Sequence, residues 1–295
     1  MRIADGLLIE VLPMPYHMQP MPTPRRSTKR PRLWPSAAWR ALRQAGRSAS
    51  RHCGRPALAS STWPVAVAWP DDPETVEEAR AHPEVFAGKS VGQVADHAGD
   101  VIARLTMKPA VVGHSFGGLL TQIVAGRGLS AVSVAIDPAP FRGVLPLPLS
   151  ALRSGSPILK NPANRSRAVA LTFDEFRYGW ANALPEDEAR QLYDTYHVAA
   201  PGLPLFQAAT ANLNPRTEAR VDTANPDRGP LLIISGQRDH TVPFAIANAS
   251  YKRQRKNAGV TEIIEIANRG HALTIDSGWR EVAETALAFV KRFAD

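Results

Sequence analysis

A serine between small residues stands at positions 113–118, which read Gly-His-Ser-Phe-Gly-Gly. The pattern is G-x-S-x-G, which is typical of a nucleophilic serine on a sharp turn between a strand and a helix. The surrounding sequence supports this turn, because the apolar residues 109–113 predict a strand and the apolar residues 118–125 predict a helix. The glycines leave room for a serine in a strained backbone conformation. The pattern therefore predicts Ser115 as a nucleophile.

A serine nucleophile needs a general base and an acid that orients the base. Asp239 follows the apolar residues 231–234, and His271 follows residues 262–266. Both side chains are therefore expected at the carboxyl ends of strands, where parallel sheets build their sites. We predict His271 as the base and Asp239 as the acid. The backbone N–H of Phe116, at the start of the helix, is expected to face a developing oxyanion.

Two further histidines stand beside these candidates. His114 precedes the serine and His240 follows the aspartate, and these places favour supporting roles over the role of the base. The remaining histidines have no spacing typical of metal ligands, and the motifs H-E-x-x-H, G-x-G-x-x-G and G-x-x-x-x-G-K-[ST] do not occur. We therefore expect no metal and no cofactor.

Predicted strands alternate with predicted helices beyond residue 63. The strands are expected at residues 63–69, 109–113, 130–136, 231–234 and 262–266, and the helices at residues 74–81, 92–105, 118–125, 243–255 and 279–293. Nearly continuous apolar strands separated by helices indicate a mostly parallel sheet covered by helices on both faces. The fold class is therefore α/β.

Residues 140–226 interrupt this alternation and are expected to form a helical cap insertion, with helices near 172–183 and 185–196. The core is then divided into residues 63–139 and 227–295. Apolar and aromatic side chains are frequent in the insertion: Leu145, Leu147, Leu149, Phe173, Phe176, Tyr178, Trp180, Leu203, Leu205 and Phe206. They are expected either to line a pocket for an apolar group or to pack the insertion on the sheet.

The three pieces GHSFGG, SGQRDHTVP and NRGHALTID occur in this order from about Trp63 onward. In this the chain resembles the α/β-hydrolase superfamily, and in particular small bacterial serine hydrolases with a helical cap. The resemblance implies that Ser115 is the nucleophile, that His271 acts as base and then as acid, and that Asp239 holds the imidazole. Some superfamily members place the acid where Asp137 stands, directly after a predicted strand, so Asp137 stays open as an alternative.

The resemblance implies hydrolysis of a carboxylic ester, thioester or lactone through an acyl-enzyme, with a small-molecule ester or lactone as the substrate. Two alternatives are open. One is a binding-only or catalytically impaired homologue, and the other is a lyase or perhydrolase that uses the same three residues. Members of the superfamily usually have a His-Gly element that supplies a second oxyanion donor, and this element is missing here. Loss of one such donor lowers turnover about 10²- to 10³-fold, so the enzyme would be impaired.

Residues 1–62 form a basic, Pro- and Arg-rich segment unlike the rest of the chain. Residues 1–70 contain eleven Lys and Arg against Asp5 and Glu10, whereas residues 71–295 contain 24 basic and 25 acidic side chains. Three interpretations are open: an arm that binds nucleic acid or lipid or directs targeting, a disordered extension, or the product of a reading-frame shift. We favour the frame shift, because the His-Gly element is missing from this segment. Residues 3–12 are a candidate for a substitute strand.

The composition of the chain bears on where the protein is located and on the partners that it binds. No run of apolar residues approaches the 18 that indicate a membrane-spanning helix. Cys53 is the single cysteine, so no internal disulfide is possible and a reducing, cytoplasmic location is expected. The basic segment lacks interleaved aromatic residues, and the rest of the chain is nearly neutral. We therefore expect neither nucleic acid nor a membrane as a partner.

Overall fold

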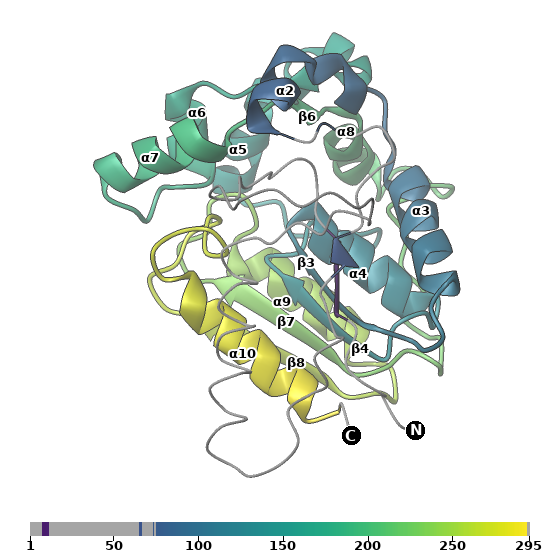
Figure 1. Cartoon of the computed structure of the whole chain (residues 1–295). Helices are drawn as coiled ribbons and strands as arrows, with labels where there is room; N and C mark the ends of the chain where they lie inside the picture. The colour runs from purple at the N-terminus through teal and green to yellow at the C-terminus, as the bar shows by residue number, and fades with distance from the viewer. Residues whose placement is uncertain (1–7, 12–64, 67–72, 74, 294–295) are drawn as a thin grey trace, which may run out of the picture.

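A computed structural model of the chain describes residues 8–11, 65–66, 73 and 75–293. Within these residues, parallel strands form a six-stranded sheet in the order β2-β1-β3-β4-β7-β8 (Figure 1). The strands are β1 (Leu8–Val11), β2 (Val65–Ala66), β3 (Ala110–His114), β4 (Val132–Ile136), β7 (Leu231–Gly236) and β8 (Thr261–Ile266). The predicted parallel α/β sheet is confirmed.

Helices cover both faces of the sheet. They are α3 (Val91–Ala103), α4 (Phe116–Gly126), α9 (Phe244–Gln254) and α10 (Trp279–Lys291). Successive side chains of a strand point to opposite faces. Val111 packs with α3 and α4, and Ala135 packs with α9, whereas Val112 and Val134 pack with α10. Both faces of the central strands are therefore buried, which explains their continuous apolar sequence.

The insertion lies together at one end of the sheet (Figure 1). Its elements are α5 (Leu149–Leu159), η2 (Pro162–Ser166), β5 (Ala168–Val169), α6 (Phe173–Gly179), α7 (Glu186–Tyr196), β6 (Ala200–Pro201) and α8 (Leu203–Thr210). Helices near α6 and α7 were expected, but α5, α8 and the antiparallel pair β5–β6 were not. Pro157 lies inside α5 and Pro204 lies in the first turn of α8, and in the sequence both prolines indicate loops.

The segment before α3 packs against the insertion. Its elements are α2 (Val76–Ala81) and η1 (Pro83–Phe86). Phe86 and Val198 belong to one buried cluster, and the Arg80 side chain donates hydrogen bonds to the carbonyls of Asp194 and His197. The sequence analysis assigned residues 63–139 to the core of the fold. Among these residues, α2 and η1 contact the insertion.

β1 lies inside the sheet. Leu8–Val11 pair with β3 along their whole length, and Ile9 and Glu10 pair with β2. Residues 3–12 were a candidate for a substitute strand, and Leu8–Val11 among them form a strand of the sheet. The segment 1–62 is therefore not entirely separate from the core. Its residues 1–7 and 12–62, on which the question of a reading-frame shift depends, lie outside the described residues.

No helix in the described part of the chain is both long enough and apolar enough to cross a membrane.

Ile9→Pro should destabilise the fold. Ile9 pairs with Val65 on one side and with Val111 on the other, and proline has no N–H to donate to either strand. A buried carbonyl left without its donor costs about 1–3 kcal/mol. Thermal unfolding followed by circular dichroism should show a lower Tm than in the wild type. The control Ile9→Val keeps the N–H, so equal Tm values for the two variants would show that β1 does not hold the sheet together.

Candidate active site

The turn between β3 and α4 holds Ser115 in a strained conformation. Its φ is 56° and its ψ is −118°, a region that a residue with a side chain rarely adopts. The N–H of Ser115 donates to the carbonyl of Ile136 in the neighbouring strand at 2.9 Å. A Cβ at Gly113 would clash with the backbone of Gly117. The glycines are therefore required by the close approach of the strand and the helix.

Three side chains from three loops meet at this turn. His271 Nε2 lies 2.9 Å from Ser115 Oγ, and His271 Nδ1 lies 2.6 Å from Asp239 Oδ2. All three residues are buried. The imidazole is therefore in position to take the hydroxyl proton at Nε2 while Nδ1–H donates to the carboxylate, which stabilises the resulting imidazolium.

The loop after β7 orients the Asp239 carboxylate. Its Oδ1 accepts hydrogen bonds from the N–H groups of Thr241 at 2.6 Å and Val242 at 2.8 Å. This leaves Oδ2 for His271. The loop is in turn joined to the loop after β8, because the N–H of Arg238 donates to the carbonyl of Arg269 at 2.7 Å. The acid and the histidine are thus held by one connected pair of loops.

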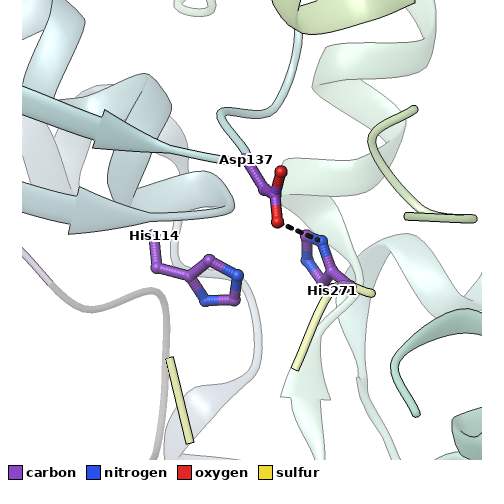
Figure 2. Close-up of side chains that lie close together, drawn as sticks. All are labelled: His114, Asp137 and His271. Carbon is purple, nitrogen blue, oxygen red and sulfur yellow. Dashed lines mark ion pairs between the residues drawn. The ribbon is translucent and has the colours of Figure 1, made fainter. Parts of the chain in front are cut away.

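Asp137 is a second carboxyl group beside the same imidazole (Figure 2). It follows β4, and its Oδ1 accepts the N–H of Gly236 at 2.8 Å. Its Oδ2 lies 4.0 Å from His271 Nδ1, beyond hydrogen-bond distance. Burial and the nearby Asp239 raise the pKa of Asp137 well above its usual range. Asp137 therefore holds its proton more tightly than an ordinary aspartate does, and Asp239 is the carboxyl group in contact with the histidine.

The neighbouring histidines lie apart from the serine hydroxyl. The ring centroid of His114 is 4.6 Å from that of His271. Burial and the nearby His271 lower the pKa of His114 well below its usual range, so it is neutral. His240 Nδ1 lies 3.0 Å from the carbonyl of Tyr178. Neither is placed to act as the base.

Among the described residues, His114, Asp137 and His271 are the cluster that offers ligand atoms for a metal, all within 4.8 Å of one another (Figure 2). Both nitrogens of His271 already face Asp239 and Ser115. A metal at this cluster would have to compete with one of these two hydrogen bonds. The geometry favours proton transfer over metal binding.

A model of the alpha/beta hydrolase family matches residues 78–285 of the chain. The chain belongs to the alpha/beta hydrolase family. The matched residues span β3, the serine turn, the insertion and the loops of Asp239 and His271. No curated protein sequence matches the chain significantly.

Solved structures resemble this α/β-hydrolase at low sequence identity. The bromoperoxidase from Bacillus anthracis is 16% identical with a TM-score of 0.57, over 97% of this chain and 92% of that one. A pyrethroid hydrolase from Sphingobium faniae JZ-2 is 13% identical with a TM-score of 0.53, over 97% of each chain. A bacterial membrane phospholipase A is 17% identical with a TM-score of 0.56, over 99% of this chain and 80% of that one. These similarities show the shared fold.

In this α/β-hydrolase the insertion also holds the site in place. The carbonyl of Trp180 accepts the N–H of Ala272, next to the histidine, and the Trp180 ring stands at 79° to that of His271 with centroids 4.5 Å apart. The Thr241 hydroxyl donates to the carbonyl of Gly179 at 2.7 Å. Sequence reasoning named Trp180 only as an apolar residue of the insertion, because nothing in the linear spacing places it against residue 271.

A cavity of about 210 Å³ opens above the serine, between the sheet and the insertion. Most of its wall is apolar. The lining includes Ser115, Phe116, Leu120, Ile158, Trp180 and Leu205. Part of the apolar insertion therefore faces the serine, as one of the two sequence-based alternatives predicted, whereas Phe173 belongs to a cluster packed inside the insertion.

Phe116 is the first residue of α4. The first N–H groups of a helix have no acceptor within the helix and carry its positive dipole end. The N–H of Phe116 is thus available beside Ser115 for a negatively charged oxygen. The segment in which a second donor was sought before the strand at residue 63 lies outside the described residues.

Asp239→Asn should lower kcat/KM by about 10³- to 10⁴-fold, because an amide at Nδ1 favours the wrong imidazole tautomer. Asp137→Asn should cost far less, since Asp137 lies 4.0 Å from His271 Nδ1 and an amide can still accept the Gly236 N–H. Steady-state kinetics on an activated ester, at equal Tm, compares the two variants. A larger loss for Asp137→Asn would transfer the role of the acid to Asp137.

Asp137→Asn should also change how stability depends on pH. The folded pKa of Asp137 is raised, so the folded state binds its proton more tightly than the unfolded state does. The free energy of unfolding of the wild type therefore falls as pH rises from the unfolded pKa of about 4 toward the folded pKa. Asparagine has no such dependence. The Tm of the variant minus that of the wild type should increase from acid to neutral pH, and a constant difference would contradict a raised pKa.

Proposed function

We propose that the chain is a serine hydrolase that cleaves a carboxylic ester, thioester or lactone through an acyl-enzyme. The observation that carries the proposal is the position of His271, whose two ring nitrogens lie 2.9 Å from Ser115 Oγ and 2.6 Å from Asp239 Oδ2. This is the geometry in which a serine hydroxyl becomes a nucleophile near neutral pH. Membership of the hydrolase family agrees with it.

In the acylation half of the reaction, Ser115 Oγ attacks the carbonyl carbon and its proton passes to His271 Nε2. Asp239 faces Nδ1–H and stabilises the imidazolium. The carbonyl oxygen becomes an oxyanion beside the N–H of Phe116 at the positive end of α4. The C–O or C–S bond of the substrate then breaks, and the leaving group takes the proton from Nε2.

The deacylation half repeats these steps with water. His271 takes a proton from the water as it attacks the acyl carbon, and Ser115 leaves as the protonated hydroxyl. The strained backbone of Ser115 holds Oγ above the turn in both halves. The site therefore works with the residues of this chain and a water molecule.

The cavity supports a substrate with an apolar acyl or alcohol group. Most of its wall is apolar, and near the turn it includes Phe116, Leu120 and Trp180. Such a wall binds hydrocarbon by removing it from water. The proteins with similar structures include a pyrethroid hydrolase, a phospholipase and a bromoperoxidase. Hydrolysis of an apolar ester is the activity that the site of this chain supports best.

Ser115→Ala should abolish covalent labelling by a fluorophosphonate probe and lower kcat by about 10⁴-fold or more. His271→Ala should cost nearly as much, and the double variant little more, because the two residues act as a unit. Labelling is followed by intact-mass spectrometry, and turnover with p-nitrophenyl esters of short and long chains.

Ser250→Ala is the matched control, because Ser250 is fully buried on α9 away from the turn. It should label and turn over like the wild type. A folded wild-type chain that neither labels at Ser115 nor hydrolyses any of the esters would instead indicate a binding-only homologue. Labelling without hydrolysis, with another product formed, would indicate a lyase or perhydrolase.

A further inference from the structure

Helix α5 has two faces of different character. Ala151, Ser154, Gly155 and Ile158 line the cavity above Ser115. Leu149, Leu152, Arg153, Ser156 and Lys160 follow the same three- and four-residue spacing on the opposite face, and all five are exposed. No residue of this helix is fully buried. One helix thus separates the cavity from the surroundings of the protein.

The outer face of α5 continues into a patch of exposed leucines, which we call the leucine patch. Its members and their exposed fractions are Leu145 at 71%, Leu147 at 66%, Leu149 at 83%, Leu152 at 41% and Leu213 at 85%. Leu213 joins the patch because the side chain of its neighbour Asn212 bonds to the backbone of Gly143 and Val144. The sequence predicted that Leu145, Leu147 and Leu149 line a pocket or pack the insertion on the sheet. They do neither, since they point to the outside.

The segment that carries four of the five leucines contains basic but no acidic side chains. Residues 138–173 contain five basic side chains and no acidic one. The basic residues are Arg142, Arg153, Lys160, Arg165 and Arg167, and all are exposed. Exposed leucines between basic side chains are the pattern by which amphipathic helices lie on anionic lipid, with the apolar groups in the acyl boundary and the cations at the headgroups. A neutral apolar partner would not explain the excess of positive charge.

We propose that the outer face of α5 docks onto a bilayer surface that contains anionic lipid. The leucines of the patch enter the boundary between headgroups and acyl chains, and the basic residues face the headgroups. This departs from the sequence-based expectation that a membrane is not a partner. Docking places the wall of the cavity at the lipid surface, next to the lipid in which an apolar ester dissolves. This last consequence rests on the proposed hydrolase function, whereas the docking itself does not.

The test is co-sedimentation of the full-length chain with vesicles of phosphatidylcholine, with and without phosphatidylserine. The wild type should bind the anionic vesicles and release them at high salt. The quadruple variant Leu145→Ser, Leu147→Ser, Leu149→Ser, Leu152→Ser should bind at least about tenfold more weakly. Arg142→Gln with Lys160→Gln should weaken binding about fivefold for each charge removed.

The basic residues 1–62 are present in every variant, so differences between variants report the patch and not that segment. Val260→Ser with Ile264→Ser is the matched control, because these side chains are 42% and 38% exposed beside and on β8, and it should bind like the wild type. Hydrolysis of a soluble short-chain ester should be unchanged in the quadruple variant, whose four positions do not line the cavity.

Equal binding by the wild type and the quadruple variant would overturn the proposal, and so would equal binding to neutral and anionic vesicles. A dimer in light scattering that the quadruple variant abolishes would also overturn it, because a second copy would then cover the patch. Binding is repeated with the Ser115→Ala chain. If the Ser115→Ala chain binds vesicles and the wild type hydrolyses no ester, the docking proposal stands and the hydrolase proposal fails.

Discussion

The arrangement of the site depends on one imidazole held between two oxygen atoms. His271 reaches Ser115 with one nitrogen and Asp239 with the other, at 2.9 and 2.6 Å. A hydrogen bond of this kind weakens steeply when its partners move or tilt, so three loops must be kept in fixed relation. They are kept so because β3, β7 and β8 are parallel strands of one sheet and end at the same edge. Packing of both faces of the sheet by helices makes that edge rigid.

Burial at this edge of the sheet raises the free-energy cost of ionising a carboxyl group. Asp137 and Asp239 both lie near His271 Nδ1 and are both removed from water. Two adjacent carboxylates cannot both be ionised there without a large cost. The fold resolves this by giving Asp239 two backbone donors and the histidine, whereas Asp137 has one backbone donor and a raised pKa. The two carboxyl groups therefore differ in their surroundings, and Asp239 is the one that contacts the histidine.

The insertion connects the candidate site with the outer surface of the protein. On its inner side, the segment around Trp180 bonds to the loops of Asp239 and His271, and α5 forms a wall of the cavity. On its outer side, the same helix carries exposed leucines and basic residues. A helix with no fully buried residue is held less tightly than the core helices.

The sequence by itself determined the parallel sheet, the serine turn and two of the residues that meet there, Ser115 and His271. The sequence predicts these features because a strained turn needs glycines and because buried parallel strands need continuous apolar runs. The loops that follow such strands lie at the same edge of the sheet. Only the tertiary structure distinguished Asp239 from Asp137. Asp239 Oδ2 lies 2.6 Å from His271 Nδ1, whereas Asp137 Oδ2 lies 4.0 Å from it, and the spacing of residues along the chain does not predict this difference. It also placed Leu8–Val11 between β2 and β3. It turned Leu149 outward and Ile158 inward on α5, because the side of a helix that faces the core depends on what packs against it and not on the helix alone.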